Sequence, residues 1–350
     1  MAIPRPIADK ERSAGKSLQK ARYWRPFKSM VQCELCPKRC VIAEGKAGFC
    51  SIRKNIKGTL YTLGYGNPVG FAIDPIEKKP FYHFLPGSSS LSFGTVGCNL
   101  GCLFCQNWQT TKSDLTKDVR VSPEEVVDLA LAQGVPSISY TYNEPTIFFE
   151  YVVDIARLAH RKGIRNVLVS NGFISDEPRK EWSRWIDAVN VDLKAFTEEF
   201  YRRQAYAMLQ PVLDTIRYYH GQKHIWMELT NLKIPTLNDS PAETRKMSRW
   251  IVDTIGPDHP LHLTAFHPAF RLEHLPPTPA KTLTDARDIA LEEGLHHVYC
   301  GNIMPGKYGN TYCSACGSLL IRRGYMSVEE NHLLEGGMCP VCRTKLPGVF

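Results

Sequence analysis

Beyond about residue 89, short apolar runs of strand-like composition alternate with longer segments whose apolar positions recur at helical spacing. Strands are expected at 91–96, 136–142, 165–170, 188–193, 223–230 and 261–266, with a short one at 297–300. Helices are expected at 122–133, 147–162, 176–185, 240–255 and 283–293, and a helical region broken near Pro211 ends at His220. The first helix has Ser122 as its cap and Pro123 at its first position, which is a typical start. The Gly- and Pro-rich segment 56–84 is expected to be irregular.

This alternation predicts the fold class. Six strand–helix units in succession indicate a parallel sheet with helices outside it. Right-handed crossovers curl such a sheet into a full or partial barrel. The span from Leu91 to Met304 is shorter than the ~250 residues of a complete eightfold barrel. We therefore predict an α/β protein with a partial (β/α)6 TIM-type barrel.

The two ends of the chain differ from this core and suggest three further regions. We expect a flexible basic arm at 1–28, an N-terminal four-cysteine metal-binding segment at 29–88, the core barrel at 89–306 and a four-cysteine module at 307–350. The basic residues of the arm are Arg5, Lys10, Arg12, Lys16, Lys20 and Arg22.

Composition narrows the class of protein. The chain has 350 residues, 43% of them hydrophobic, and no apolar run of the ~18 residues that a membrane span needs. The start has no apolar signal region, so no membrane partner and no secretion are expected. The net charge of +8 is mild and indicates a solvated face rather than a nucleic-acid surface. Without a signal peptide, the twelve cysteines indicate metal sites in a reducing cytoplasm.

The most informative motif lies directly after the first predicted strand. Cys98, Cys102 and Cys105 are spaced C-x3-C-x2-C, with Phe104 before the last cysteine. Three thiolates bind three irons of a 4Fe–4S cluster and leave the fourth iron open, whereas electron-transfer clusters usually have four cysteines. Gly97 and nearby Gly101 let the backbone wrap closely around such a cluster. The pattern resembles the signature of the radical S-adenosylmethionine (SAM) enzymes.

The N-terminal cysteines Cys33, Cys36, Cys40 and Cys50 lie within eighteen residues. Four thiolates this close suit a tetrahedral zinc site, and the same ligands suit an auxiliary iron–sulfur cluster. We favour zinc over the cluster, and either metal over unligated buried cysteines.

The C-terminal cysteines Cys313, Cys316, Cys339 and Cys342 form two CxxC knuckles separated by 22 residues. This spacing matches a zinc-ribbon or rubredoxin-like module that holds zinc or iron, and a structural metal is expected because so short a module buries little apolar area. Its basic residues are few, which argues against nucleic-acid binding. The lone Cys300 is interpreted as buried packing.

Polar residues follow each predicted strand. In a barrel of this type the active site lies at the carboxyl ends of the strands. Any one of these residues alone would be read as a turn or core residue, but six polar strand ends on one rim indicate a binding site. The candidates are Asn143, Glu144, Asn171, Asp192, Lys194, Glu228, Thr230 and His267. We assign Glu144 to the ammonium of SAM, and Lys194 and His267 to its carboxylate or a neighbouring anion. Ribose, a cation or the substrate is assigned to Asn171, Asp192, Glu228 and Thr230.

The same segments resemble a known group of enzymes. Asn143-Glu144-Pro145 and Asp192-Leu193-Lys194 are similar to the Gly-Gly-Glu-Pro and Asp-x-Lys elements of pyruvate formate-lyase-activating enzyme and its relatives, and His267 matches a strand-six histidine. Over nearly the whole chain, further segments are similar to the radical SAM component of the AmmeMemoRadiSam system. These segments are 33–37, 140–146, 190–196 and 264–268, together with the C-terminal cysteine module. The chain departs from the pattern at 202–208, where a Cys-Gly step is usual, and at Thr236, where glycine is common.

These observations predict an enzyme. We expect reductive cleavage of SAM at the 4Fe–4S cluster to a 5′-deoxyadenosyl radical, which abstracts hydrogen from a small-molecule substrate. The electron donor is expected to be flavodoxin- or ferredoxin-like. The alternatives are an activase that installs a glycyl radical on a protein partner, and a non-catalytic metal- or nucleic-acid-binding protein.

Overall fold

The computed structural model of the protein describes residues 18–112, 120–304 and 306–350. The described residues divide into two compact units. The first unit contains the chain up to Asp74 together with 89–101 and 107–187, and the second contains 75–88, 102–106 and 188–350. Arg5, Lys10, Arg12 and Lys16 of the expected basic arm lie outside the described residues.

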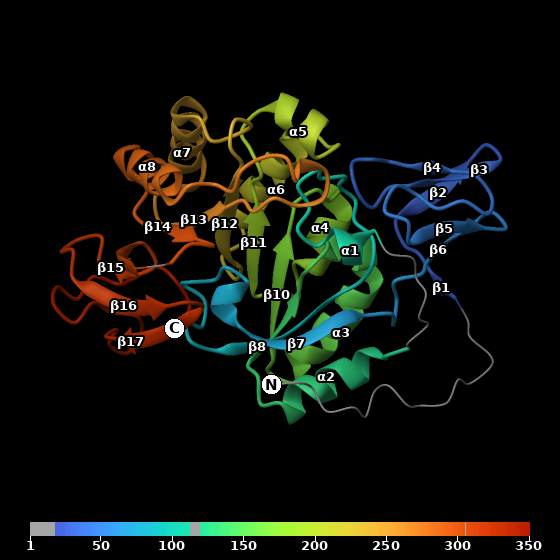
Figure 1. Ribbon diagram of the computed structural model, residues 1–350. Helices are drawn as coiled ribbons and strands as arrows, with labels where there is room; N and C mark the ends of the chain where they lie inside the picture. Colours follow the sequence, from blue (N-terminus) through green and yellow to red (C-terminus); the bar gives the residue numbers. More distant parts are fainter. Residues whose placement is uncertain (1–17, 113–119, 305) are drawn as a thin grey trace. The chain divides into compact units, whose positions relative to one another are not determined.

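The sheet of the first unit has the strand order β7-β8-β9-β10 (Figure 1). Its strands are β7 (Val69–Pro75), β8 (Ser89–Gly94), β9 (Ser137–Tyr140) and β10 (Arg165–Ser170). Strands β8 and β9 are parallel, as are β9 and β10, so that Ser90 and Arg165 both face Ser137. The described helices of this unit are α1 (Trp108–Thr111), α2 (Pro123–Ala132), the 3-10 helix η2 (Pro145–Phe148), α3 (Phe149–Arg161) and α4 (Asp176–Trp182).

Helix α2 begins as its sequence predicts. The Ser122 hydroxyl accepts a hydrogen bond from the Glu125 amide at 3.2 Å, and the Glu125 carboxylate accepts one from the Ser122 amide at 2.8 Å. This reciprocal pair satisfies two amides at the helix start that have no partner within the helix.

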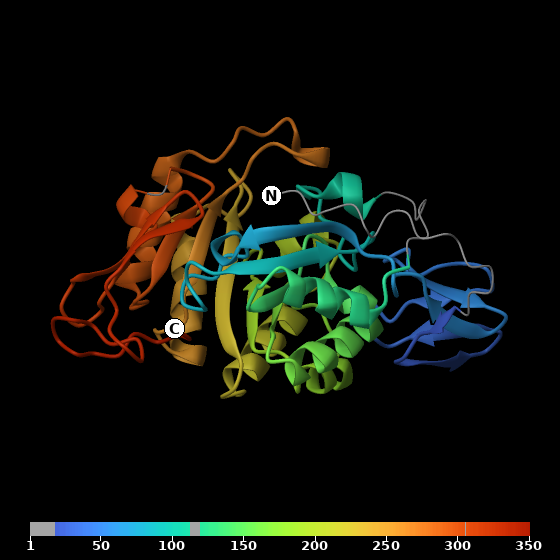
Figure 2. The same ribbon diagram turned by 90° about the horizontal axis from the view of Figure 1, so that it is seen from below.

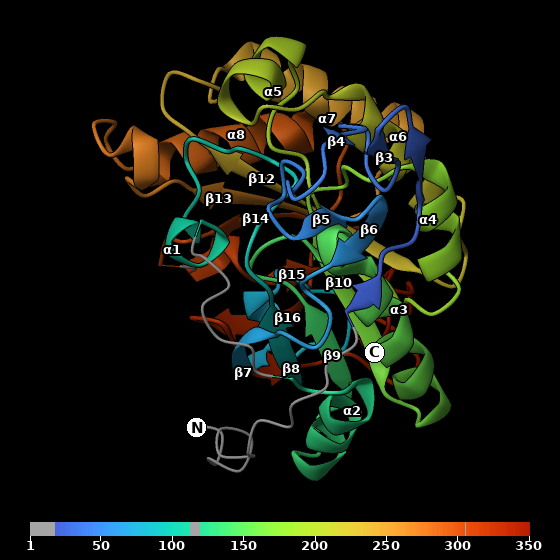
Figure 3. The same cartoon turned by 90° about the vertical axis from the view of Figure 1, so that its right-hand side faces the viewer.

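The N-terminal part of the first unit is more regular than the sequence suggested (Figure 3). It forms the antiparallel sheets β1-β6-β5 and β2-β3-β4. Their strands are β1 (Gln19–Lys20), β2 (Trp24–Phe27), β3 (Met30–Cys33), β4 (Val41–Ile42), β5 (Arg53–Ile56) and β6 (Thr59–Thr62).

Two expectations about this part are therefore wrong. Residues 19–20 and 24–27, assigned to the arm, form β1 and β2, because an edge strand can pair its backbone while basic side chains point to solvent. The segment 56–84 contains β6 and β7, and Gly58, with φ of +76°, forms the turn between β5 and β6.

The second unit has four parallel strands in the order β11-β12-β13-β14 (Figure 2). They are β11 (Ala188–Asp192), β12 (Trp226–Lys233), β13 (Leu261–Ala265) and β14 (Val298–Gly301). The α-helices are α5 (Glu198–Gln204), α6 (Gln210–His220), α7 (Pro241–Ile255) and α8 (Ala280–Glu292), with the short 3-10 helices η1 (Ile76–Lys78), η3 (Phe270–Leu272) and η4 (Gly306–Tyr308). The predicted break lies between α5 and α6, and Pro211 stands in the first turn of α6.

The C-terminal module also belongs to the second unit. It contains the antiparallel strands β15 (Thr311–Tyr312), β16 (Leu319–Gly324) and β17 (Ser327–Asn331). A small buried cluster of Cys313, Leu320, Ile321, Cys339 and Leu346 forms its core. So small a core leaves the module dependent on a further stabilising element, as expected for a metal-binding ribbon.

A buried polar network joins the module to the parallel strands. Arg323 of β16 donates hydrogen bonds to Thr311 Oγ1 at 2.7 Å and to the Tyr82 carbonyl at 2.6 Å. The Tyr299 hydroxyl of β14 lies 2.8 Å from Thr311 Oγ1 and 2.6 Å from His83 Nε2. The module is therefore attached through several buried hydrogen bonds, although Arg323 Nε has no hydrogen-bond partner among the described residues.

The expected α/β class is confirmed, as a partial barrel of parallel strands with a C-terminal metal module. Among the described helices, none is both long and apolar enough to cross a membrane.

Candidate active site and metal centres

The cysteine loop follows β8 and is held by close backbone approaches. A Cβ atom on Gly94, the last residue of β8, would lie 2.4 Å from the Thr141 carbonyl oxygen. A Cβ on Gly97, whose φ is +85°, would lie 2.2 Å from the Cys50 carbonyl oxygen. Both positions therefore require glycine, and Cys98 begins the loop directly after this contact.

In the first unit, amide donors surround the Cys98 sulfur. The Leu100 backbone amide lies 3.4 Å from Cys98 Sγ, and the Asn171 side-chain amide lies 3.9 Å from it. The Asn171 amide also donates to Asn99 Oδ1 at 2.9 Å. Such donors stabilise a thiolate, so this position suits a metal-bound cysteine.

Glu144 is fully buried beside this group. Its Oε1 accepts from the Thr146 amide at 2.9 Å, the Thr146 hydroxyl at 2.7 Å and the Ser170 hydroxyl at 2.9 Å, while Oε2 accepts from the Asn171 amide at 2.8 Å. Burial raises the pKa of Glu144 and these hydrogen bonds oppose that shift. Because Oε2 has one donor, it retains capacity for a further donor such as an ammonium.

The side chain of Asn143, which the motif predicted to bind the cofactor, contacts the backbone at the start of the cysteine loop. Its side-chain amide donates to Thr95 Oγ1 and to the Gly97 carbonyl, both at 3.0 Å, and its Oδ1 accepts from the Thr95 amide at 3.1 Å. These contacts tie the end of β9 to the start of the cysteine loop. In the structure Asn143 therefore supports the loop.

In the second unit, Lys194 lies close enough to Cys102 for their charges to interact. Its Nζ lies 3.0 Å from Asp192 Oδ2 and 5.9 Å from the centre of the Phe104 ring. Burial disfavours its ammonium, but the charges of Asp192 and Cys102 raise the pKa of Lys194 above its ordinary value. Burial also raises the pKa of the Cys102 thiol to about 11, and Lys194 opposes that shift.

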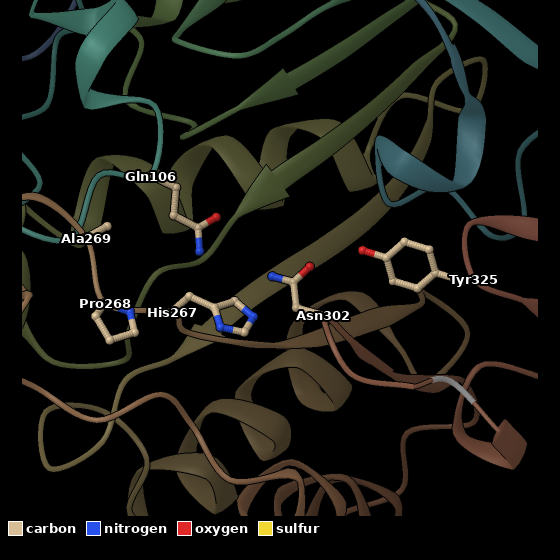
Figure 4. A pocket seen from close by; sticks show the side chains of 6 residues that line it. All are labelled: Gln106, His267, Pro268, Ala269, Asn302 and Tyr325. Carbon is tan, nitrogen blue, oxygen red and sulfur yellow. The ribbon is translucent and has the colours of Figure 1, made fainter.

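A pocket of about 370 Å³ lies at the carboxyl ends of β13 and β14 in the second unit. It is lined by Gln106, His267, Pro268, Ala269, Asn302 and Tyr325. Figure 4 shows the side chains of Gln106, His267 and Asn302 directed toward a common space, with the Tyr325 hydroxyl pointing toward Asn302. Its polar lining consists of amides, a phenol and an imidazole, and none of the lining residues is acidic.

Two predicted site residues lie away from the strand ends. Glu228 is the third residue of β12, and its carboxylate accepts from the amides of Tyr82 and His83 and from Trp226 Nε1, and lies 2.6 Å from His262 Nε2. Thr230 donates to Asn190 Oδ1 at 2.8 Å. The sequence placed the strand at 223–230, but β12 runs from Trp226 to Lys233. The Glu228 side chain therefore lies below the rim and already has its own partners, whereas Thr230 pairs in register with Asp192, the last residue of β11.

The C-terminal cysteines form a compact group. All four sulfurs lie within 4.8 Å of one another, with Cys313 Sγ to Cys342 Sγ at 3.5 Å and Cys316 Sγ to Cys339 Sγ at 3.7 Å. A single metal ion with sulfurs at about 2.3 Å in a tetrahedron requires sulfur–sulfur distances of about 3.8 Å. The residues therefore fit one tetrahedral ion.

The other cysteines are arranged differently. Within the described residues, no three sulfurs of Cys33, Cys36, Cys40 and Cys50 come within 4.8 Å of one another. Cys33 and Cys50 are buried, and the Cys33 amide donates to the Cys40 carbonyl at 2.9 Å. Cys300 is buried against α8, with its sulfur 3.6 Å from the Leu283 carbonyl. This position agrees with its interpretation as packing.

The sequence reasoning missed three residues of the pocket. Asn302 directly follows the short last strand, so the rule that singled out His267 could have found it. Gln106 follows the last cysteine of the triplet. No sequence pattern indicates Tyr325 as a pocket residue. It lies between β16 and β17 of the C-terminal module, far along the chain from the strands of the barrel.

Sequence comparison identifies the class of protein to which this site belongs. A profile of the radical SAM superfamily matches residues 93–247, which include the cysteine triplet, Glu144, Asp192 and Lys194. The chain therefore contains a radical SAM domain and is a radical SAM enzyme, as its cysteine spacing predicted.

Individual relatives extend this result. The chain is 42% identical over 320 residues to the uncharacterized protein MJ0808 of Methanocaldococcus jannaschii, covering 90% of this chain and 95% of that one. It is 23% identical over 188 residues to pyruvate formate-lyase 1-activating enzyme of Escherichia coli K12, covering 52% of this chain and 75% of the enzyme. A crystal structure of a radical SAM methyltransferase from Sphaerobacter thermophilus aligns with a TM-score of 0.49 and 17% identity, over 67% of this chain and 71% of that one.

Proposed function

We propose that this enzyme cleaves SAM at a 4Fe–4S cluster bound by Cys98, Cys102 and Cys105, and removes a hydrogen atom from a small molecule held beside His267. The pocket at the ends of β13 and β14 is the observation that favours a small molecule. Its size is within the range of sites that enclose metabolites.

The residues around the cysteine loop fit the cluster. Leu100 and Asn171 place amide donors at the Cys98 sulfur, and glycine at position 97 lets the backbone approach closely. When bound, the cluster and SAM supply a one-electron cleavage that yields a carbon radical. The protein binds and orients the reactants, and excludes water from them.

Each SAM contact is assigned from the chemistry of the side chain. The Glu144 carboxylate accepts from the ammonium, because its Oε2 retains an unused acceptor position. The Lys194 ammonium attracts the carboxylate and stays charged, because Asp192 and Cys102 raise its pKa. His267 donates to the same carboxylate or to the substrate.

The pocket lining suggests the substrate class. Gln106, Asn302 and the Tyr325 hydroxyl donate and accept hydrogen bonds without a negative charge. Such a lining suits a polar molecule that carries amide, hydroxyl or carboxylate groups, and gives no counter-charge to a cation. The electron donor is proposed to be a flavodoxin- or ferredoxin-type protein.

An activase that installs a glycyl radical on a protein is the second candidate. Similarity to pyruvate formate-lyase 1-activating enzyme over about half of this chain favours it. For the C-terminal module we propose a structural zinc ion, because its sulfur spacing suits one ion and the metal compensates for its small core.

The experiment is anaerobic reconstitution with iron and sulfide, followed by dithionite and SAM. We expect methionine and 5′-deoxyadenosine from the natural chain and from the control Cys300→Ala, and neither product from Cys102→Ala. A preparation with a full cluster that yields no 5′-deoxyadenosine would refute the proposal. A yield that rises with a dialysable metabolite fraction supports a small-molecule substrate, whereas a rise only with a glycyl-radical protein supports the activase.

A further inference from the structure

We propose that Cys33, Cys36, Cys40 and Cys50 bind a second iron–sulfur cluster, which passes electrons to the cluster at Cys98. The binding site stands on its own observations, while the electron transfer rests on the function proposed above. The donor for this step is a low-potential flavodoxin- or ferredoxin-type protein.

The first argument is the spacing of the sulfurs. The C-terminal cysteines have the arrangement that fits one ion, because two pairs of their sulfurs lie 3.5 and 3.7 Å apart. In the N-terminal group, all of whose members are described, no three sulfurs lie within 4.8 Å of one another. One zinc ion requires all four sulfurs at about 3.8 Å from each other. A 4Fe–4S cube binds one cysteine at each of four corners and separates the sulfurs further.

The second argument is the charge beside the group. Arg53 is only 2% exposed, and its guanidinium is attracted to the sulfurs of Cys33 and Cys50. Its Nη1 donates to Glu150 at 3.0 and 3.1 Å, while its buried Nε has no hydrogen-bond partner among the described residues. The backbone amides of Ile52 and Arg53 donate to the Cys50 sulfur. Arg53 and Glu150 form a buried ion pair whose positive end faces the sulfurs, and this orientation, together with the amide donors, favours the reduced state of an iron–sulfur cluster.

The third argument is the contact between Cys50 and the start of the central cysteine loop at Gly97 and Cys98, all of which lie in the first unit. The Cys50 carbonyl oxygen occupies the place where a side chain on Gly97 would begin. Consecutive Cα atoms are about 3.8 Å apart, so the backbones of Cys50 and Cys98 lie within about 10 Å of each other.

The electron balance is simple. The N-terminal cluster gains one electron from the protein donor and loses one electron to the cluster at Cys98. It returns to its oxidised state, no bond forms or breaks at it, and no proton is required. The electron is then consumed in the cleavage of SAM.

The binding site is tested without catalysis. In the variant Cys98→Ala/Cys102→Ala/Cys105→Ala, reconstituted anaerobically, we expect about four irons and four sulfides per chain, as one such cluster requires. Dithionite should give the paramagnetic resonance signal of a reduced cluster. The further change Cys36→Ala should abolish the iron, the sulfide and the signal. Iron without sulfide in the triple variant, or zinc alone at the N-terminal site, would overturn the proposal.

The electron transfer is tested in the variant Cys36→Ala with the central cysteines intact. The control is Val41→Ala, because Val41 is 43% exposed on β4 of the small sheet β2-β3-β4. With dithionite, which reaches the central cluster directly, both variants should form 5′-deoxyadenosine at the natural rate. With a reduced flavodoxin, Cys36→Ala should be at least tenfold slower. Equal rates with both donors would reject the transfer, whereas absence of product from the natural chain with dithionite would reject the proposed function instead.

Discussion

The ammonium of Lys194 lies 3.0 Å from the Asp192 carboxylate, two residues before it. The Lys194 side chain is 16% exposed and that of Asp192 is 32% exposed, so the pair is partly shielded from water. This ion pair favours the charged form of Lys194 and holds its ammonium beside the last residue of β11, where the sequence predicts a contact with SAM.

Lys194→Met should therefore weaken SAM binding at least tenfold, which corresponds to about 1.4 kcal/mol. The loss follows from removing a partly shielded positive charge that would face the carboxylate of SAM. Anaerobic calorimetry on the cluster-loaded protein measures it, and Lys180→Met, in an exposed pair with Glu177, is the control. Equal affinity of Lys194→Met and the natural chain would remove Lys194 from the SAM site.

Tyr325 should affect the substrate more than SAM. Removing its side chain with Tyr325→Ala is expected to raise the KM for the substrate at least tenfold, and Tyr325→Phe should show whether the hydroxyl is responsible. The rate of 5′-deoxyadenosine formation without substrate should not change. Ser327→Ala, exposed on the same hairpin, is the matched control. A rise in KM with Ser327→Ala as well would indicate that the hairpin as a whole is disturbed.

Removing metal from the C-terminal module should loosen it. Cys316 and Cys342 are exposed, so a chelator reaches the site, and one ion per chain should be released. Because the core of the module is small, limited proteolysis should then cut within 307–350 first. Mass spectrometry of the fragments and metal analysis measure both effects. A module that stays resistant after complete loss of metal would show that its core and Arg323 suffice.

Stability should fall in mild acid through His297. Burial lowers the pKa of His297 from its ordinary 6.5 to about 4, and its Nε2 has no hydrogen-bond partner among the described residues. Between these values the unfolded chain binds a proton that the folded chain does not, so lowering the pH from 7 to 5 favours unfolding by about 2 kcal/mol. The midpoint of thermal unfolding should drop less in His297→Leu than in the natural chain. An equal drop in both would assign the acid sensitivity to other groups.

Thr236 is strained. Its φ is +68°, a region that a β-branched residue rarely adopts. Thr236→Gly should stabilise the protein by about 1 kcal/mol in urea unfolding. Thr236→Ala retains a Cβ atom and should give a smaller gain. A loss of stability in Thr236→Gly would mean that the hydrogen bond from the Thr236 amide to Asp239 or the side-chain packing outweighs the strain.

The sequence predicts best where local chemistry decides the structure. The Ser122 cap gave the start of α2 correctly, and the cysteine spacing identified the radical SAM class. It fails where pairing partners are distant. The pattern of apolar and polar positions does not show that β12 extends to Lys233, and it therefore predicts Glu228 near the end of the strand. In the structure the Glu228 carboxylate accepts hydrogen bonds from the amides of Tyr82 and His83. Nor could they show that Tyr325 shares a pocket with His267.

The pocket is lined by residues from distant parts of the chain, so it forms late in synthesis. Gln106 leaves the ribosome next to the cysteine triplet, whereas Asn302 and Tyr325 are added only after nearly all of β8 to β14. During synthesis the thiols of Cys102 and Cys105 are therefore exposed long before the walls beside them exist. A carrier protein that shields the nascent chain from oxygen, until iron is inserted into the full-length chain, would protect these thiols.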